Sequence, residues 1–167
     1  MELADHTMTG RELEFAVYCI ENVAAALGRS SGDVYRALSG DNGILRQYIV
    51  PSYDVLHTQG KEYIVNDIVE VMAERGVAVD AEVRWERTDM TANKNLLRMK
   101  FARVIEAYAA RTGCTLDEAL DKFYRSQTYE LMRDGISDMH CMSDAYLVDE
   151  LIDETSASEA RTRMEYR

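Results

Sequence analysis

Apolar positions in this chain recur at steps of three and four residues, which is the spacing of one face of an α-helix. The first such stretch follows Thr9-Gly-Arg-Glu12, a sequence with the form of a helix-starting capping box. It stops at Gly28, a residue suited to the turn after a helix. The pattern predicts a long first helix whose apolar side carries Leu13, Val17, Ile20, Ala24 and Leu27.

Four shorter helices are predicted before Gly76. Ser30 or Ser31 can cap the second, which runs through Leu38 to the turn at residues 40–43. A third runs from about Ile44 to Val50, and Pro51 suits the first turn of a fourth with Tyr53, Val55 and Leu56. The fifth begins after Gly60 and has an apolar side made of Ile64, Ile68, Val71 and Met72.

The second half of the chain follows the same plan. Leu97, Phe101, Val104, Ile105 and Tyr108 predict a long helix, and Thr115-Leu-Asp-Glu118 is a second capping box. Short helical segments are expected at residues 129–132 and 136–141. The last helix is predicted over residues 144–154, with Ser143 as its N-cap.

An internal duplication underlies this plan. The segment from His57 to Ile68 returns 83 positions later as His140 to Leu151, and it keeps the histidine and the tyrosine six places on. Upstream the offset is 85, since Gly28 is echoed by Gly113. We therefore predict an all-α fold of two tandem five-helix units packed on each other, at residues 9–76 and 91–154.

The segments outside the two units look different. Residues 77–90 are predicted to form an extended linker, because apolar residues alternate there with the two-residue period of a strand as far as Trp85. This segment is expected to lie along a groove with Trp85 tucked in, although pairing with a short strand or across a dimer stays open. Residues 155–167 lack apolar periodicity and are predicted to form a flexible tail.

The net charge of −11 narrows the classes of partner. Nucleic acids and anionic membrane surfaces would be repelled, whereas a basic protein would be attracted; solubility alone is the plainer reading of the charge. The three cysteines show no Cys-x-x-Cys spacing, and no apolar run approaches 18 residues. We therefore expect a cytoplasmic protein with reduced thiols, and self-association stays open.

Catalytic chemistry is hard to find in the sequence. His57 and His140 invite such a role because they recur at the same place, but no partner group or metal-ligand spacing accompanies them. We interpret each imidazole as bonding a backbone group in the turn before the last helix of its unit. The sequence therefore predicts no cofactor, no metal and no enzymatic activity.

The residues suited to a protein partner are aromatic or acidic. Tyr63 and Tyr146 recur near the start of the last helix of each unit, and Trp85 lies in the linker. Residues 144–154 contain no basic residue, which is typical of a solvated helix face or of a docking surface for a basic protein. The candidate partner-binding residues are His57, Tyr63, Trp85, His140, Tyr146, Asp144, Asp149, Glu150 and Asp153.

Two segments of the first unit resemble a family of small bacterial domains of unknown function. These segments are Cys19-Ile-Glu21 and Leu56-His-Thr-Gln-Gly-Lys-Glu-Tyr-Ile64, and the resemblance covers residues 11–75. The second unit resembles a diverged relative that keeps His140 and Tyr146 but lacks the Thr-x-Gly after the histidine. Members of this family look like companions of another uncharacterised family, which is encoded in neighbouring genes and itself resembles ADP-ribosyltransferases. This association implies an antitoxin-like or immunity-like role.

Three hypotheses of function follow. The first is a non-catalytic, acidic interaction protein that binds and restrains a protein partner. The second is an acidic nucleic-acid mimic or a regulatory module resembling a helix-turn-helix, although direct nucleic-acid binding would need clustered basic residues. The third is a small enzyme that uses His57 or His140.

Overall fold

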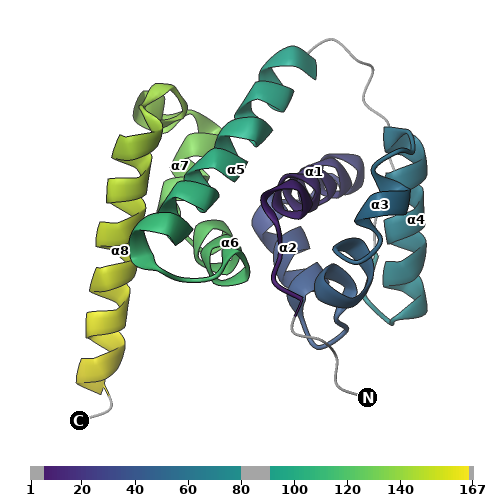
Figure 1. Cartoon of the computed structure of the whole chain (residues 1–167), viewed down its shortest axis with the longest axis horizontal. Helices are drawn as coiled ribbons and strands as arrows, with labels where there is room; N and C mark the ends of the chain where they lie inside the picture. The colour runs from purple at the N-terminus through teal and green to yellow at the C-terminus, as the bar shows by residue number, and fades with distance from the viewer. Residues whose placement is uncertain (1–5, 80–90, 166–167) are drawn as a thin grey trace. The chain divides into compact units, whose positions relative to one another are not determined.

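The computed structural model describes residues 6–79 and 91–165, with the side chains of 91–95 left aside. Every regular element in these two stretches is helical, which confirms the predicted all-α class (Figure 1). The chain divides into two compact units: Thr9–Arg98, here called the first unit, and Met99–Arg167 together with Met1–Met8, the second unit. Most of the predicted strand-like linker, including Trp85, lies outside the described residues.

The first unit begins with the long helix α1 (Gly10–Leu27), and its N-terminus is capped as predicted. The N–H of Thr9 donates to Glu12 Oε2 at 2.7 Å, and the N–H of Glu12 donates to Thr9 Oγ1 at 3.3 Å. This reciprocal pair satisfies backbone donors that the helix itself leaves unpaired. The helix ends at Gly28, whose φ of 62° is a left-handed conformation that glycine adopts at low cost.

Four shorter elements complete the first unit. They are α2 (Ser31–Ser39), the π-helical turn η1 (Ile44–Ile49), α3 (Tyr53–Leu56) and α4 (Lys61–Glu74). Ser30, rather than Ser31, caps α2, since its hydroxyl accepts from the N–H of Asp33 at 3.1 Å. Ser31 instead donates its hydroxyl to Glu21 on α1 at 2.8 Å, which ties the first turn of α2 to that helix.

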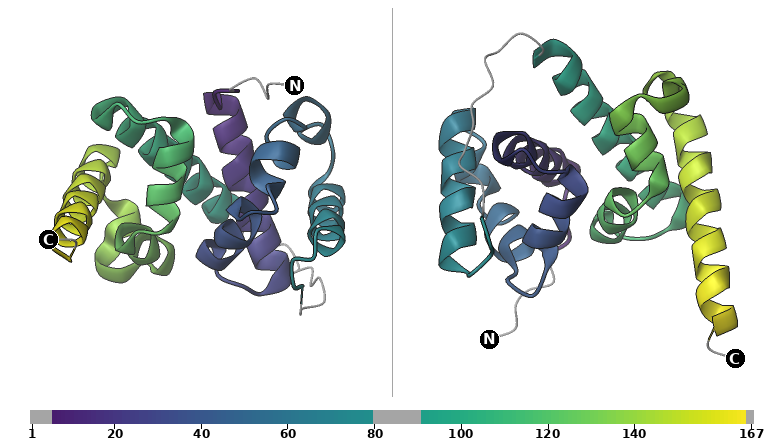
Figure 2. Two further views of the ribbon diagram at one scale, coloured as in Figure 1. Left: turned by 90° about the horizontal axis from the view of Figure 1, so that it is seen from below. Right: turned by 180° about the vertical axis from the view of Figure 1, so that it is seen from behind.

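The core of the first unit forms around α1, which contacts α2 and α4 on different sides (Figure 2). Most of the apolar side chains that the sequence pattern selects are buried in it, whereas Val71 is only half-buried. The exposed fractions of the buried ones do not exceed 4%, and they include Leu13, Val17, Ile20, Leu27, Leu38, Ile44, Ile64, Ile68 and Met72. The three- and four-residue spacing therefore identified the buried sides of these helices correctly.

The second unit contains most of α5 (Thr91–Thr112), whose first turns belong to the first unit. It continues with α6 (Leu116–Tyr124), α7 (Gln127–Asp134), the 3-10 turn η2 (Ile136–Cys141) and α8 (Asp144–Glu165). Its core holds an aromatic cluster whose ring centroids lie 4.9–5.4 Å apart, formed by Phe101, Phe123, Tyr124 and Tyr129. Such edge-on and tilted pairs are favourable arrangements of aromatic rings.

The predicted end of the last helix at Glu154 is wrong, because α8 continues to Glu165. Residues 155–167 contain no glycine or proline to stop it. Lys122 on α6 also pairs with Glu159 at 3.1 Å, and the hydroxyls of Tyr108 and Thr155 lie 3.1 Å apart. The extension therefore needs no apolar side of its own, and all of residues 156–165 are exposed.

The helix bounds repeat at the two offsets found in the sequence. Helices α2 and α6 have nine residues each, and their first residues, Ser31 and Leu116, are 85 positions apart. Helices α4 and α8 begin at Lys61 and Asp144, which are 83 positions apart.

Candidate functional site

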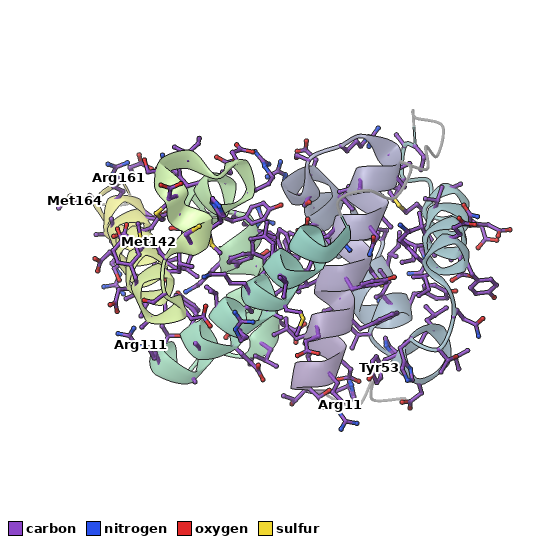
Figure 3. All side chains as sticks on the ribbon, turned by 90° about the horizontal axis from the view of Figure 1, so that it is seen from above. Arg11, Tyr53, Arg111, Met142, Arg161 and Met164 are labelled. Atoms are coloured by element: carbon purple, nitrogen blue, oxygen red, sulfur yellow. The ribbon has the colours of Figure 1, made fainter. Side chains whose placement is uncertain are left out.

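The turn between α3 and α4 is held together by His57. Its Nδ1 lies 2.5 Å from the carbonyl oxygen of Tyr53, so a protonated Nδ1 donates a hydrogen bond back across α3. The imidazole also stacks on the Tyr53 ring, with centroids 4.4 Å apart, and Tyr53 meets Phe15 of α1 edge-on at 5.6 Å. Figure 3 shows Tyr53 near the end of α1 that carries Arg11. The interpretation of His57 as a residue that ties down this turn is confirmed.

Other residues of the two resembling segments also serve the fold. Thr58 donates its hydroxyl to the carbonyl of Val55 at 2.8 Å, and Leu56 and Ile64 are buried. Cys19 and Ile20 are fully buried on α1. Burial raises the pKa of the Cys19 thiol, which disfavours the thiolate that a nucleophile or metal ligand would need.

Two large side chains in this region are not used by the fold. Val55 on α3 is 67% exposed, and Tyr63 on α4 is 56% exposed. By contrast, Leu56, next to Val55, and Ile64, next to Tyr63, are buried. Each of the two exposed positions leaves a large apolar or aromatic side chain open to solvent on the first unit.

A second tyrosine, Tyr48, contacts α4. Tyr48 of η1 donates its hydroxyl to Asp67 Oδ2 on α4 at 2.5 Å. Burial raises the pKa of Tyr48 to about 12, and the hydrogen bond to Asp67 and the nearby Tyr63 and Glu74 add to the effect. The hydrogen bond places the Tyr48 hydroxyl beside Asp67, which lies one helical turn after Tyr63 on α4.

The exposed side of α4 is acidic as well as aromatic. Glu62, Glu70 and Glu74 are exposed, and none of the ion pairs among residues 6–79 and 91–165 involves them. Arg75, the basic residue after the helix, bonds instead to the carbonyl of Asn42 at 2.5 Å. Sequence reasoning missed Tyr48, Val55 and these glutamates, although the spacing of Tyr63, Asp67, Glu70 and Glu74 along one helix side was a signal for them.

The surroundings of His140 differ from those of His57. It lies on η2, is exposed, and its ring packs so close to Gly135 that an added Cβ there would lie 3.3 Å from it. No backbone hydrogen bond to this imidazole occurs in the part of the chain that the structure describes. The prediction of such a bond is therefore wrong for His140, because the turn here is formed by left-handed residues, Ser137 and Asp138, instead.

Two of the five acids in the acidic run of α8, Asp144 and Asp149, are neutralised within its own unit. Asp144 pairs with Arg103 at 2.8 Å and with Lys100 at 3.7 Å, and Asp149 pairs with Arg111 at 2.6 Å. All three bases come from α5. The absence of basic residues from 144 to 154 therefore does not make this run a purely acidic surface.

Three members of the acidic run have other surroundings. Glu154 accepts hydrogen bonds from the first turn of α7, whereas Glu150 and Asp153 are exposed and have no basic partner among the described residues. Tyr146 is 42% exposed, and a hydrogen bond to Glu150 raises the pKa of its phenol. Glu150, Asp153 and Tyr146 thus resemble the exposed side of α4 in composition.

The described residues contain neither a metal-binding cluster nor a membrane-spanning helix. No group of three or more histidine, cysteine, aspartate or glutamate side chains in 6–79 and 91–165 is arranged to hold a metal ion. None of the described helices has the length and apolar character needed to cross a bilayer.

Comparison with known proteins supports the resemblance for the first half of the chain. Residues 14–75 match the model of a family described as protein of unknown function (DUF3791). The match lies entirely within the first unit, from α1 to the end of α4, and includes His57 and Tyr63. No curated protein and no solved structure matches the chain significantly.

Proposed function

We propose that this protein is a non-catalytic interaction protein that binds a protein partner through the exposed sides of α3 and α4. The observation that carries the proposal is the exposure of two large side chains on consecutive helices of the first unit, Val55 at 67% and Tyr63 at 56%. Tyrosine is favoured at protein interfaces because its ring supplies contact area and its hydroxyl supplies a hydrogen bond.

The role of His57 in the turn supports this choice over catalysis. A general base needs a nitrogen directed at a substrate within a cleft, whereas the Nδ1 of His57 is engaged by the Tyr53 carbonyl and its ring by the Tyr53 ring. The neighbouring Thr58 hydroxyl donates to a backbone carbonyl rather than to the imidazole. Both side chains therefore stabilise the turn that presents Tyr63.

The proposed partner is an ADP-ribosyltransferase-like protein encoded beside this one, which the chain restrains in the manner of an antitoxin or immunity protein. Support for this partner comes from the family resemblance of residues 11–75 and is associational. The physical support concerns only the charge of the partner. The exposed side of α4 has a tyrosine and carboxylates outside the ion pairs of the described residues, and such a side suits a protein surface with basic residues.

Co-expression of the full chain with the product of the adjacent gene tests the proposal. We expect a stoichiometric complex in size-exclusion chromatography with light scattering, and loss of any ADP-ribosyl transfer by the partner. Tyr63→Ala should weaken the complex at least about tenfold, as loss of an aromatic anchor does. Met164→Ala, at an 80% exposed position on α8, is the matched control and should change nothing.

A folded chain that forms no complex with this partner would contradict the proposal. So would a complex that is equally tight with Tyr63→Ala and Val55→Asp. Circular dichroism of each variant shows that the fold is retained, which both exposed positions should allow.

A further inference from the structure

The exposed sides of α4 and α8 carry the same three groups at the same spacing. On α4 they are Tyr63, Asp67 and Glu70, and on α8 they are Tyr146, Glu150 and Asp153. Each residue of the second set lies 83 positions after its counterpart. Steps of four and then three residues place a tyrosine and two carboxylates side by side on a helix. We call each set a tyrosine–acid face.

Both faces point away from a core that also repeats. The buried positions of α4 are Ile64, Val65 and Ile68, and the same offset leads to the buried Leu147, Val148 and Leu151 of α8. In the first unit Asp67 accepts a hydrogen bond from the Tyr48 hydroxyl, and in the second unit Glu150 raises the pKa of the neighbouring Tyr146 phenol. The second carboxylate, Glu70 or Asp153, is exposed.

The acids that recur are the ones without a base. Asp144 and Asp149, which pair with bases of α5, correspond at the same offset to Lys61 and Asn66 of α4. The recurring acids Asp67, Glu70, Glu150 and Asp153 take part in none of the ion pairs within the two described stretches. The neutralised acids therefore serve the fold of the second unit, whereas the unneutralised ones belong to the pattern that both helices share.

We propose that each tyrosine–acid face docks a basic amphipathic helix of a protein partner, so that one chain offers two equivalent docking faces. This inference rests on the proposed function and specifies the chemistry of its partner. Two carboxylates three residues apart, about 4.5 Å along the helix axis, match lysine or arginine side chains one turn apart on the docked helix. The adjacent phenol ring offers a further favourable surface to such a cation.

Charge complementarity favours this occupant over a second copy of the chain. Each face carries two negative charges on a protein of net charge −11, so two such faces would repel each other. A basic helix gains from both carboxylates, and its apolar side can cover Tyr63 in the first unit or Tyr146 in the second.

Calorimetric titration of the full chain at low salt tests the number of faces. The probe is a synthetic alanine-based helix with arginines at i and i+4 and leucines beside them; a peptide with glutamine in place of arginine is its control. We expect two arginine peptides bound per chain, with weakening as salt is added. Glu70→Arg or Asp153→Arg should each lower the stoichiometry to one, and the double variant should bind at least tenfold more weakly overall.

Matched charge reversals separate face-specific docking from general attraction. Glu14→Arg on α1 and Glu130→Arg on α7 change exposed acids outside the two faces, one in each unit, and should leave two sites. Amide chemical shifts of the labelled chain should move around Tyr63 and Tyr146. A single site, shifts spread over the whole acidic surface, or an equal effect of the control reversals would overturn the inference.

The partner complex distinguishes this inference from the proposed function. If the product of the adjacent gene binds with unchanged affinity to the Glu70→Arg, Asp153→Arg double variant, docking on the two faces is refuted while partner binding stands. If that product does not bind the folded wild-type chain at all, the proposed function fails and the assignment of the faces to it fails with it.

Discussion

Glu154 on α8 closes the first turn of α7 through Thr128: its Oε2 accepts from the Thr128 N–H at 3.1 Å and from the Thr128 hydroxyl at 2.8 Å. Its other oxygen accepts from the N–H of Gln127 at 2.5 Å. Backbone donors in the first turn of a helix have no partner within it, and negative charge is favoured at that end. A carboxylate 26 positions away in the sequence therefore caps α7 together with Ser126.

Replacing Glu154 should destabilise the second unit. Glu154→Ala leaves the N–H groups of Gln127 and Thr128 without this acceptor, and we expect a loss of about 1–3 kcal/mol in the free energy of unfolding. Urea denaturation followed by circular dichroism measures it. Asp153→Ala, on the same helix but exposed and without a partner among the described residues, should lie within about 0.5 kcal/mol of the wild type. Equal effects of the two substitutions would contradict the capping role.

Replacing each of the two histidines with alanine should cost the protein different amounts of stability. His57→Ala removes the hydrogen bond to the Tyr53 carbonyl and the ring stack, and should cost about 0.5–1.5 kcal/mol. His140→Ala removes a ring that packs on Gly135 without a backbone bond among the described residues, and should cost less than about 0.5 kcal/mol. Thermal unfolding of both variants checks the difference, and a larger loss for His140→Ala would refute it.

Tyr48 should ionise later than an ordinary tyrosine, and stability should depend on pH accordingly. Its folded-state pKa of about 12 lies above the unfolded value of about 10, so the folded state favours the protonated phenol. The contribution to stability is fully present below pH 10 and is lost as the pH rises towards 12. Ultraviolet absorbance during a pH titration follows this ionisation.

The variant Tyr48→Phe isolates this effect. It should remove one late-titrating phenol from the absorbance curve and flatten the fall in stability between pH 10 and 12. Tyr53→Phe, at a tyrosine whose hydroxyl makes no hydrogen bond to the described residues, is the control and should leave that fall in place. A late phenol that persists in Tyr48→Phe would show that another tyrosine is responsible.

Exchanging the N-caps of α4 and α8 should move stability in opposite directions. Gly60 begins α4 with an extended backbone and open space around its Cβ position, whereas Ser143 caps α8 by accepting from the N–H of Tyr146 at 3.2 Å. Gly60→Ser adds a capping hydroxyl and restricts the unfolded chain, so it should stabilise by about 0.5–1 kcal/mol.

The reverse change completes the comparison. Ser143→Gly should lower the free energy of unfolding by a similar or smaller amount, about a few tenths of a kcal/mol. Glycine tolerates the cap position but offers no side-chain acceptor. Denaturant unfolding of both variants measures the two shifts. Destabilisation by Gly60→Ser would mean that the turn after His57 cannot accommodate a side chain.

Local signals predicted most of the fold. Thr9, Ser30, Thr115 and Ser143 all cap helices where capping sequences were recognised. Gly28 and Gly113 adopt left-handed conformations at the ends of the two long helices. These signals work because a cap involves residues three or four positions apart, so its partners are visible in the sequence.

The shape of η2 and the extension of α8 could not be predicted from such local signals. Ser137 and Asp138 adopt left-handed conformations although neither is glycine, which makes η2 unlike the turn at His57. The extension of α8 beyond Glu154 depends on Lys122 and Tyr108, which meet Glu159 and Thr155 from earlier helices. Apolar periodicity cannot predict the last turns of such a helix, because these turns bury no side chains.

The sequence by itself determined the helical class, the caps and buried sides of the helices, and the recurrence of a histidine and a tyrosine at fixed offsets, because each depends on residue types at short spacing. Only the tertiary structure decided which acids of α8 are neutralised. Arg103 and Arg111 lie 41 and 38 positions before Asp144 and Asp149, and only the path of the folded chain brings them within 2.8 and 2.6 Å. Coulomb attraction acts through distance in space, which a run of residue types does not contain.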